Sequence, residues 1–97
     1  MPTFHVKDTF EIPTRKLFVM AGTILNGKIQ AGMFVRVRCN SELDMKVRIH
    51  SIEFALRKNG EDVCLCIEAD PKLAQLLRGL NIANQTVDVV LEVDKKR

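Results

Sequence analysis

The sequence contains no tryptophan and no tyrosine, and its only large aromatic residues are five phenylalanines. This scarcity argues against modes of nucleic-acid binding that stack bases on aromatic rings. Three cysteines, an odd number, do not suit a disulfide framework, so we expect a reducing, cytoplasmic location. No apolar run approaches the roughly 18 to 20 residues of a membrane span, and no N-terminal stretch reads as a signal peptide. We therefore expect no membrane partner.

The 97 residues carry 15 Lys and Arg against 12 Asp and Glu, which gives a formal charge of +3. This length predicts a single domain over residues 1–97, with an ordered barrel over 3–93 and a basic tail at 94–97. The net charge permits contact with nucleic acid but does not require it. Whether the protein binds nucleic acid therefore depends on where the cations lie.

Apolar residues alternate with polar ones along most of the chain, which predicts strands at 4–12, 17–25, 33–39, 45–56, 63–68 and 87–93. Within 45–56 the large apolar residues fall at odd-numbered positions up to Ile49 and at even-numbered positions from Ile52 on, so we expect a bulge near His50 and Ser51. Gly22 within the second predicted strand indicates another irregularity. Asp70 and Pro71 begin the one helical pattern, near 71–78. Because so many short strands need their edges hidden, we predict an all-β, closed, six-stranded antiparallel barrel with one short helix. The predicted core contains Val35, Val37, Val47, Ile49, Leu65, Ile67, Val87 and Val89.

The cysteines and histidines are the only set that suggests a metal site. Cys64 and Cys66 lie in an apolar strand rather than on a turn, where zinc ligand pairs usually sit, so we interpret them as core residues. Glu61 and Asp62 fall in a predicted turn and are interpreted as solvated. We predict no metal, no cofactor and no catalytic residues.

Residues 22–28 match the first seven positions of a phosphate-binding loop, ending at Lys28. The eighth position, which should be Ser or Thr to hold magnesium, is Ile29, and a strand rather than a helix is predicted to follow. We interpret the glycines as hairpin residues and expect no GTP binding.

The predicted strands 33–39 and 45–56 carry cations on the face opposite their apolar residues. With Cys39 placed opposite Met45, Arg38 would lie beside Lys46 and Arg36 beside Arg48. Like charges that face each other are destabilising, so such pairs indicate an anion partner, most plausibly phosphate. The alternative is that the acids Glu42, Asp44 or Glu92 neutralise the cations, or that the cations are only solvated. The predicted RNA-binding residues are Arg15, Lys16, Arg36, Arg38, Lys46 and Arg48.

The order of several short motifs resembles the second, β-barrel domain of the translational GTPases, that of elongation factor Tu. The motifs are Val6–Arg15, Ala21–Ile29 with Gly32, Ser51–Phe54, Asn59–Val63 and Arg78–Leu80. The resemblance implies a six-stranded barrel that holds the acceptor end of aminoacyl-tRNA or a ribosomal surface. None of the motifs of the GTPase domain is present, so it does not imply GTP hydrolysis.

At the positions that approach the aminoacylated adenosine in that family, Asp8, Phe10 and Glu53 keep the family's residue types. Lys7 replaces an acid and Ala21 replaces a threonine. The resemblance therefore implies a translation-linked binding role rather than a tRNA carrier.

The sequence leaves two alternative functions open. The first is a non-catalytic module that binds RNA, the ribosome or a translation factor through its basic face. The second is an adaptor that docks on a protein partner and binds no nucleic acid.

Overall fold

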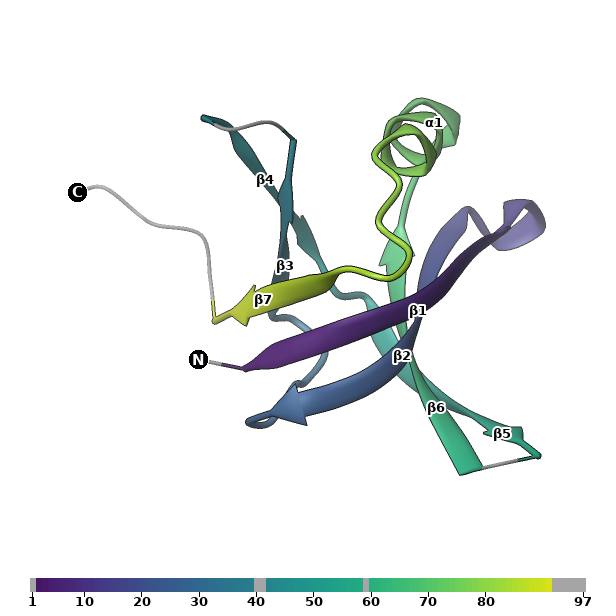
Figure 1. Ribbon diagram of the computed structural model, residues 1–97. Coiled ribbons are helices and arrows are strands. Elements are labelled where there is room, and N and C mark those ends of the chain that lie inside the picture. Colours follow the sequence, from purple (N-terminus) through teal and green to yellow (C-terminus); the bar gives the residue numbers. More distant parts are fainter. Residues whose placement is uncertain (1, 40–41, 59, 92–97) are drawn as a thin grey trace.

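The computed structural model describes residues 2–39, 42–58 and 60–91, most of which are in strands (Figure 1). The predicted basic tail at 94–97 lies outside the described residues, as does the end of the predicted last strand. The strands are β1 (Thr3–Ile12), β2 (Leu17–Asn26), β3 (Phe34–Arg38), β4 (Asp44–Arg48), β5 (Ser51–Arg57), β6 (Gly60–Glu68) and β7 (Thr86–Val90). The helical segments are the 3-10 turn η1 (Pro13–Arg15) and the α-helix α1 (Pro71–Gly79).

The strands form one antiparallel sheet in the order β4-β3-β7-β1-β2-β6-β5. The prediction of a closed barrel of six strands is wrong in both respects. The sheet has seven strands, and within the described chain no strand pair joins its two ends, β4 and β5. The prediction of a mainly antiparallel β fold with one short helix is confirmed.

The seventh strand arises because the predicted strand 45–56 is broken where its parity changes. The Ile49 N–H donates to the Met33 carbonyl oxygen (2.8 Å), whereas the His50 N–H donates to the Cys66 carbonyl oxygen in β6 (2.8 Å). Two consecutive residues thus form hydrogen bonds with opposite ends of the sheet, the first beside β3 and the second with β6. The chain crosses from one edge of the sheet to the other at this point, and the two edges are not joined by a ladder.

The main core lies on one face of the sheet and includes every residue that the sequence placed there. Its largest further members include Phe4, Phe18, Met20 and Leu77 of α1, which are almost fully buried. A smaller apolar cluster lies on the other face of β2 and β6, where side chains are short. Its members are Leu17, Val19, Ala21, Cys64 and Cys66.

A bulge in β1 reverses which face that strand presents. Val6 pairs with Gly22 and Asp8 with Ala21, so Lys7 is the extra residue. The irregularity predicted from Gly22 is therefore present, but the inserted residue belongs to the neighbouring strand. Before the bulge the alternate residues of β1 enter the core, and after it Asp8 and Phe10 lie on the other face.

The helix α1 begins and ends close to its predicted bounds. The Leu73 N–H donates to the Asp70 carboxylate (2.8 Å), and Ala74 and Leu77 are buried against the sheet. In the part of the chain that the structure describes, no helix is long and apolar enough to cross a bilayer.

Candidate nucleic-acid interface

The register of the β3–β4 hairpin differs by two residues from the predicted one. Val37 pairs with Met45, Arg36 with Lys46, and Arg38 with Asp44. A shift of two keeps the cations on the predicted face, because side chains alternate with a period of two. It changes their partners, however, and neither of the two predicted like-charge pairs forms. Among the described residues of this hairpin, Arg36 with Lys46 is the single pair of like charges that face each other.

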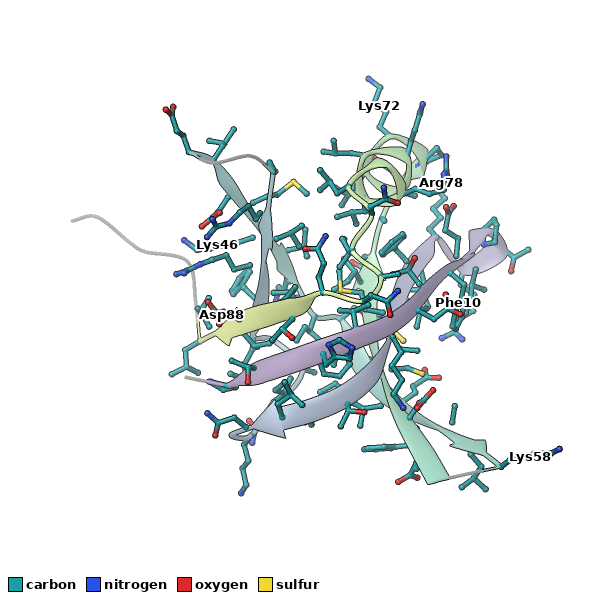
Figure 2. The ribbon with its side chains drawn as sticks, viewed as in Figure 1. Phe10, Lys46, Lys58, Lys72, Arg78 and Asp88 are labelled. Atoms are coloured by element: carbon teal, nitrogen blue, oxygen red, sulfur yellow. The ribbon has the colours of Figure 1, made fainter. Side chains whose placement is uncertain are left out.

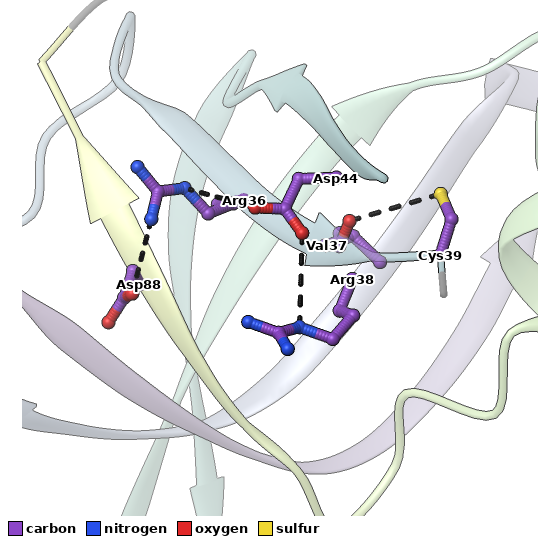
Figure 3. A network of polar contacts seen from close by, with 6 residues as sticks. All are labelled: Arg36, Val37, Arg38, Cys39, Asp44 and Asp88. Carbon is purple, nitrogen blue, oxygen red and sulfur yellow. Dashed lines mark hydrogen bonds and ion pairs between the residues drawn. The ribbon is translucent and has the colours of Figure 1, made fainter. Parts of the chain in front are cut away.

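Two of the predicted RNA-binding cations lie next to acids (Figure 3). Arg36 Nε lies 3.8 Å from Asp44 Oδ2, and Arg36 Nη1 lies 3.7 Å from Asp88 Oδ2 on β7. Arg38 Nε lies 3.8 Å from Asp44 Oδ1. The predicted alternative is therefore confirmed in part: Asp44 lies beside both arginines, and Asp88, which the sequence did not single out, also lies beside Arg36.

The two cations of β4 have no such partner. Lys46 projects from the hairpin on the same side as Asp88 (Figure 2), and Arg48 lies opposite Phe34. Within the described residues, neither Lys46 nor Arg48 forms an ion pair. Their charges are thus the ones on this hairpin that are open to an external anion.

A cavity of about 400 Å³ runs beside β4, and we call it the β4 groove. It combines an apolar floor with cations at its rim, and its apolar members come from β3, β4, β6 and α1. The groove is lined by Phe34, Met45, Lys46, Val47, Arg48, His50, Ile67, Glu68 and Leu73. The sequence did not indicate the groove, because nothing in its pattern brings Leu73 of the helix near β4.

The outer edge of β4 carries backbone groups that no other described strand pairs with. The Cys39 N–H donates to Leu43 and the Ile49 N–H donates to Met33, and both bonds fit the hairpin register. Since hydrogen-bonded and non-hydrogen-bonded pairs alternate in an antiparallel ladder, the backbone groups of Asp44, Lys46 and Arg48 point away from β3. The backbone groups of Lys46 and Arg48, two residues that line the β4 groove, are therefore on its side of the strand.

The other two predicted cations lie on the turn after β1. Arg15 ends the 3-10 turn, and Lys16 adopts a left-handed conformation (φ 55°) that closes it. They line a second cavity of about 440 Å³, the turn cavity, whose walls include Glu68 and Leu73. Because those two residues also line the β4 groove, the two cavities adjoin. The structure thus brings Arg15 and Lys16 to the same region as Lys46 and Arg48.

One acid lies between the two cation groups. Glu68 Oε2 is 3.5 Å from His50 Nδ1, and both side chains are largely exposed.

The residues singled out by the family resemblance share a face but are not gathered into one pocket. Pairing across four strands places Asp8, Ala21, Cys64 and Glu53 in one row on the face opposite the main core. Phe10 lies on the same face and is 42 % exposed. Glu53 is three strands from Asp8, roughly 14 Å at normal strand spacing. Neither acid lines the β4 groove or the turn cavity.

The thiols on this face are structural. Cys64 and Cys66 are buried, as predicted for core residues, and burial raises the pKa of the Cys66 thiol above its ordinary value of 9.0. A protonated, buried thiol is a poor nucleophile and a poor metal ligand. Among the residues that the structure describes, no three His, Cys, Asp or Glu side chains come together as a metal site.

One polar pair contradicts the sequence interpretation. Asp62, expected in a solvated turn, lies in β6 and is 7 % exposed. Its Oδ1 is 3.2 Å from the Nζ of Lys7, the bulged residue of β1. Only the bulge brings this lysine to Asp62, so the pair could not be read from the sequence.

Comparison with known proteins gave no match to a family model, to a curated protein or to a solved structure.

Proposed function

We propose that this protein is a non-catalytic binding module of the elongation factor Tu domain 2 type, which contacts RNA, free or within the ribosome. The contact would be made to backbone phosphates by Lys46 and Arg48 at the β4 groove and by Arg15 and Lys16 at the turn cavity. Such contacts give affinity without sequence preference, in keeping with the shortage of aromatic residues.

The observation that carries the proposal is the division of the basic residues into two classes. Arg36 and Arg38 lie within 3.8 Å of carboxylates, whereas Lys46 and Arg48 form no ion pair with a described residue. An arginine already beside an acid gains little from a phosphate, because its field is partly cancelled. The free cations of β4 should therefore contribute more to RNA affinity than the arginines of β3.

The experiment compares two double variants in binding to a structured RNA over a range of salt concentrations. Lys46→Ser with Arg48→Ser should weaken binding and reduce the slope of log affinity against log salt by about two units. A matched control, Lys28→Ser with Lys58→Ser, removes the same charge from exposed positions away from the groove. Equal effects of the two variants, or no RNA binding by the unaltered protein at low salt, would overturn the proposal.

The second candidate function, a protein-interaction adaptor, is favoured by the free backbone edge of β4. An extended peptide could pair with this edge, place alternate apolar side chains on the groove floor, and direct acidic ones to Lys46 and Arg48. A probe peptide of alternating valine and glutamate tests this function. Binding that is lost when alternate peptide nitrogens are methylated, together with an absence of RNA binding, would favour the adaptor.

A further inference from the structure

The far end of the sheet from the β4 groove is a second open edge. β5 is the last strand in the order and, in the described part of the chain, it pairs on one side only, with β6. The β5–β6 hairpin projects away from the rest of the sheet, with Lys58 near its tip (Figures 1 and 2). An open edge of this kind can pair with another strand unless it is protected by charge, proline or irregular geometry.

This edge strand exposes large apolar side chains on one face. Phe54 is 63 % exposed and Leu56 is 86 % exposed, and they are successive residues on the same side of β5. Phe54 pairs with the partly exposed Val63, so the apolar surface continues onto β6. Single exposed apolar residues are common, but a pair of them on a free strand edge marks an interaction surface.

We propose that β5 pairs with β5 of a second copy of this chain, antiparallel and centred on Ala55. This register places Phe54 of each copy opposite Leu56 of the other, on one face of the joined sheet. The exposed apolar residues of the two copies would then cover one another, as cross-strand pairs do within a sheet.

The charges of the strand fit the same register. With Ala55 facing Ala55, Glu53 of one copy comes opposite residue 57 of the other, which is an arginine in the sequence. The sequence therefore offers an acid and a base at facing positions twice in the symmetric pair. Moving the centre of the pairing to Phe54 or to Leu56 keeps the same faces together but separates the acid from the base. Centring on Ala55 is therefore the register in which the apolar residues and the charges pair at the same time.

A second copy is the occupant that these features select. A two-fold interface requires that one surface complement itself, and β5 does so in both charge and apolar pattern. The pairing also closes, since each copy uses its β5 edge once, and it leaves β4 free at the other end of the sheet. The inference is thus independent of the proposed RNA contact.

The first experiment measures the mass of the full chain by sedimentation across roughly micromolar to millimolar concentrations. The unaltered protein should pass from monomer to dimer and no further. Phe54→Ser with Leu56→Ser should raise the dissociation constant at least tenfold, while circular dichroism remains that of the folded protein because both side chains are exposed. The matched control, Leu25→Ser with Leu43→Ser, removes two other exposed leucines and should leave the dimer intact.

The second experiment tests the register by charge reversal. Glu53→Lys alone and Arg57→Glu alone each place like charges opposite one another, so each variant should dimerise at least tenfold more weakly. A mixture of the two variants pairs opposite charges at both positions and should restore the dimer. A monomer at every concentration, a dimer that survives the loss of Phe54 and Leu56, growth beyond two copies, or no rescue in the mixture would each overturn the inference.

Discussion

Arg36 and Lys46 lie directly opposite each other on β3 and β4, so the hairpin holds two like charges at one register position. Two carboxylates, those of Asp44 and Asp88, lie within 3.8 Å of the Arg36 guanidinium and offset the repulsion. The two acids offset only part of the positive charge of this face, so removing one of them should strengthen its attraction for an anion.

Asp88→Asn should strengthen RNA binding. The change removes one acid from Arg36 and leaves the neighbouring Lys46 without a nearby negative charge on β7. We expect the affinity at low salt to rise several-fold, with a steeper salt dependence. Stability should change by only about 0.5 kcal/mol or less, because the ion pair is partly exposed and its atoms lie 3.7 Å apart. Binding isotherms of the two proteins at matched salt check this, and an unchanged affinity would place the RNA elsewhere.

The sequence predicted the faces of the strands better than their partners. Apolar alternation identified Val35, Val37 and Val47 as core residues, since burial depends only on which side of the strand a residue occupies. The partners of Arg36 and Arg38 depend on the length of the hairpin loop, and a shift of two residues satisfies the same alternation. The periodicity therefore located the basic face but could not say which cations meet acids.

The apolar alternation could not predict whether the sheet closes into a barrel. The change of parity near His50 correctly marked an irregularity, but a bulge and a crossover to another strand produce the same change of parity. The structure distinguishes them by where the N–H groups of Ile49 and His50 bond. The β4 groove exists because this crossover leaves β4 as an open edge.

Gly22→Ala should destabilise the fold strongly. A Cβ at residue 22 would lie 1.9 Å from the His5 carbonyl oxygen in the bulged strand, so one of the two backbones has to move. We expect a loss of at least about 1–3 kcal/mol in the free energy of unfolding. Denaturant titration measures the loss.

Gly79→Ala is the control for that change. Apart from its chain neighbours and the backbone of its own helix, no described atom lies within 4 Å of the position that its Cβ would take, and the residue ends α1. Alanine is the better helix former, so this variant should be equally stable or more stable, by up to about 1 kcal/mol. Similar losses in the two variants would mean that the close approach at Gly22 is not what restricts that position.

Lys7→Met should destabilise the protein by removing a cation that lies beside a buried carboxylate. Asp62 is 7 % exposed, and its Oδ1 lies 3.2 Å from Lys7 Nζ, so its charge is poorly hydrated. We expect a loss of about 1–3 kcal/mol, of which the second change Asp62→Asn should recover part. A double-mutant cycle by chemical unfolding gives the coupling between the two positions. A coupling near zero would show that the bulge does not depend on this pair.

The buried Cys66 thiol should make stability depend on pH in the alkaline range. Burial raises its pKa in the folded protein above 9.0, so the folded state holds this proton more tightly than the unfolded state does. The contribution of Cys66 to the free energy of unfolding is fully present below pH 9.0 and is lost as the pH rises through the folded-state pKa. The loss occurs because the thiol ionises in the unfolded chain at a lower pH than in the folded protein, which favours the unfolded state. The sequence has no tyrosine, so phenol ionisation does not overlap this range. Unfolding free energies at several pH values should fall more steeply above pH 9 in the unaltered protein than in Cys66→Ala, and parallel curves would contradict the raised pKa.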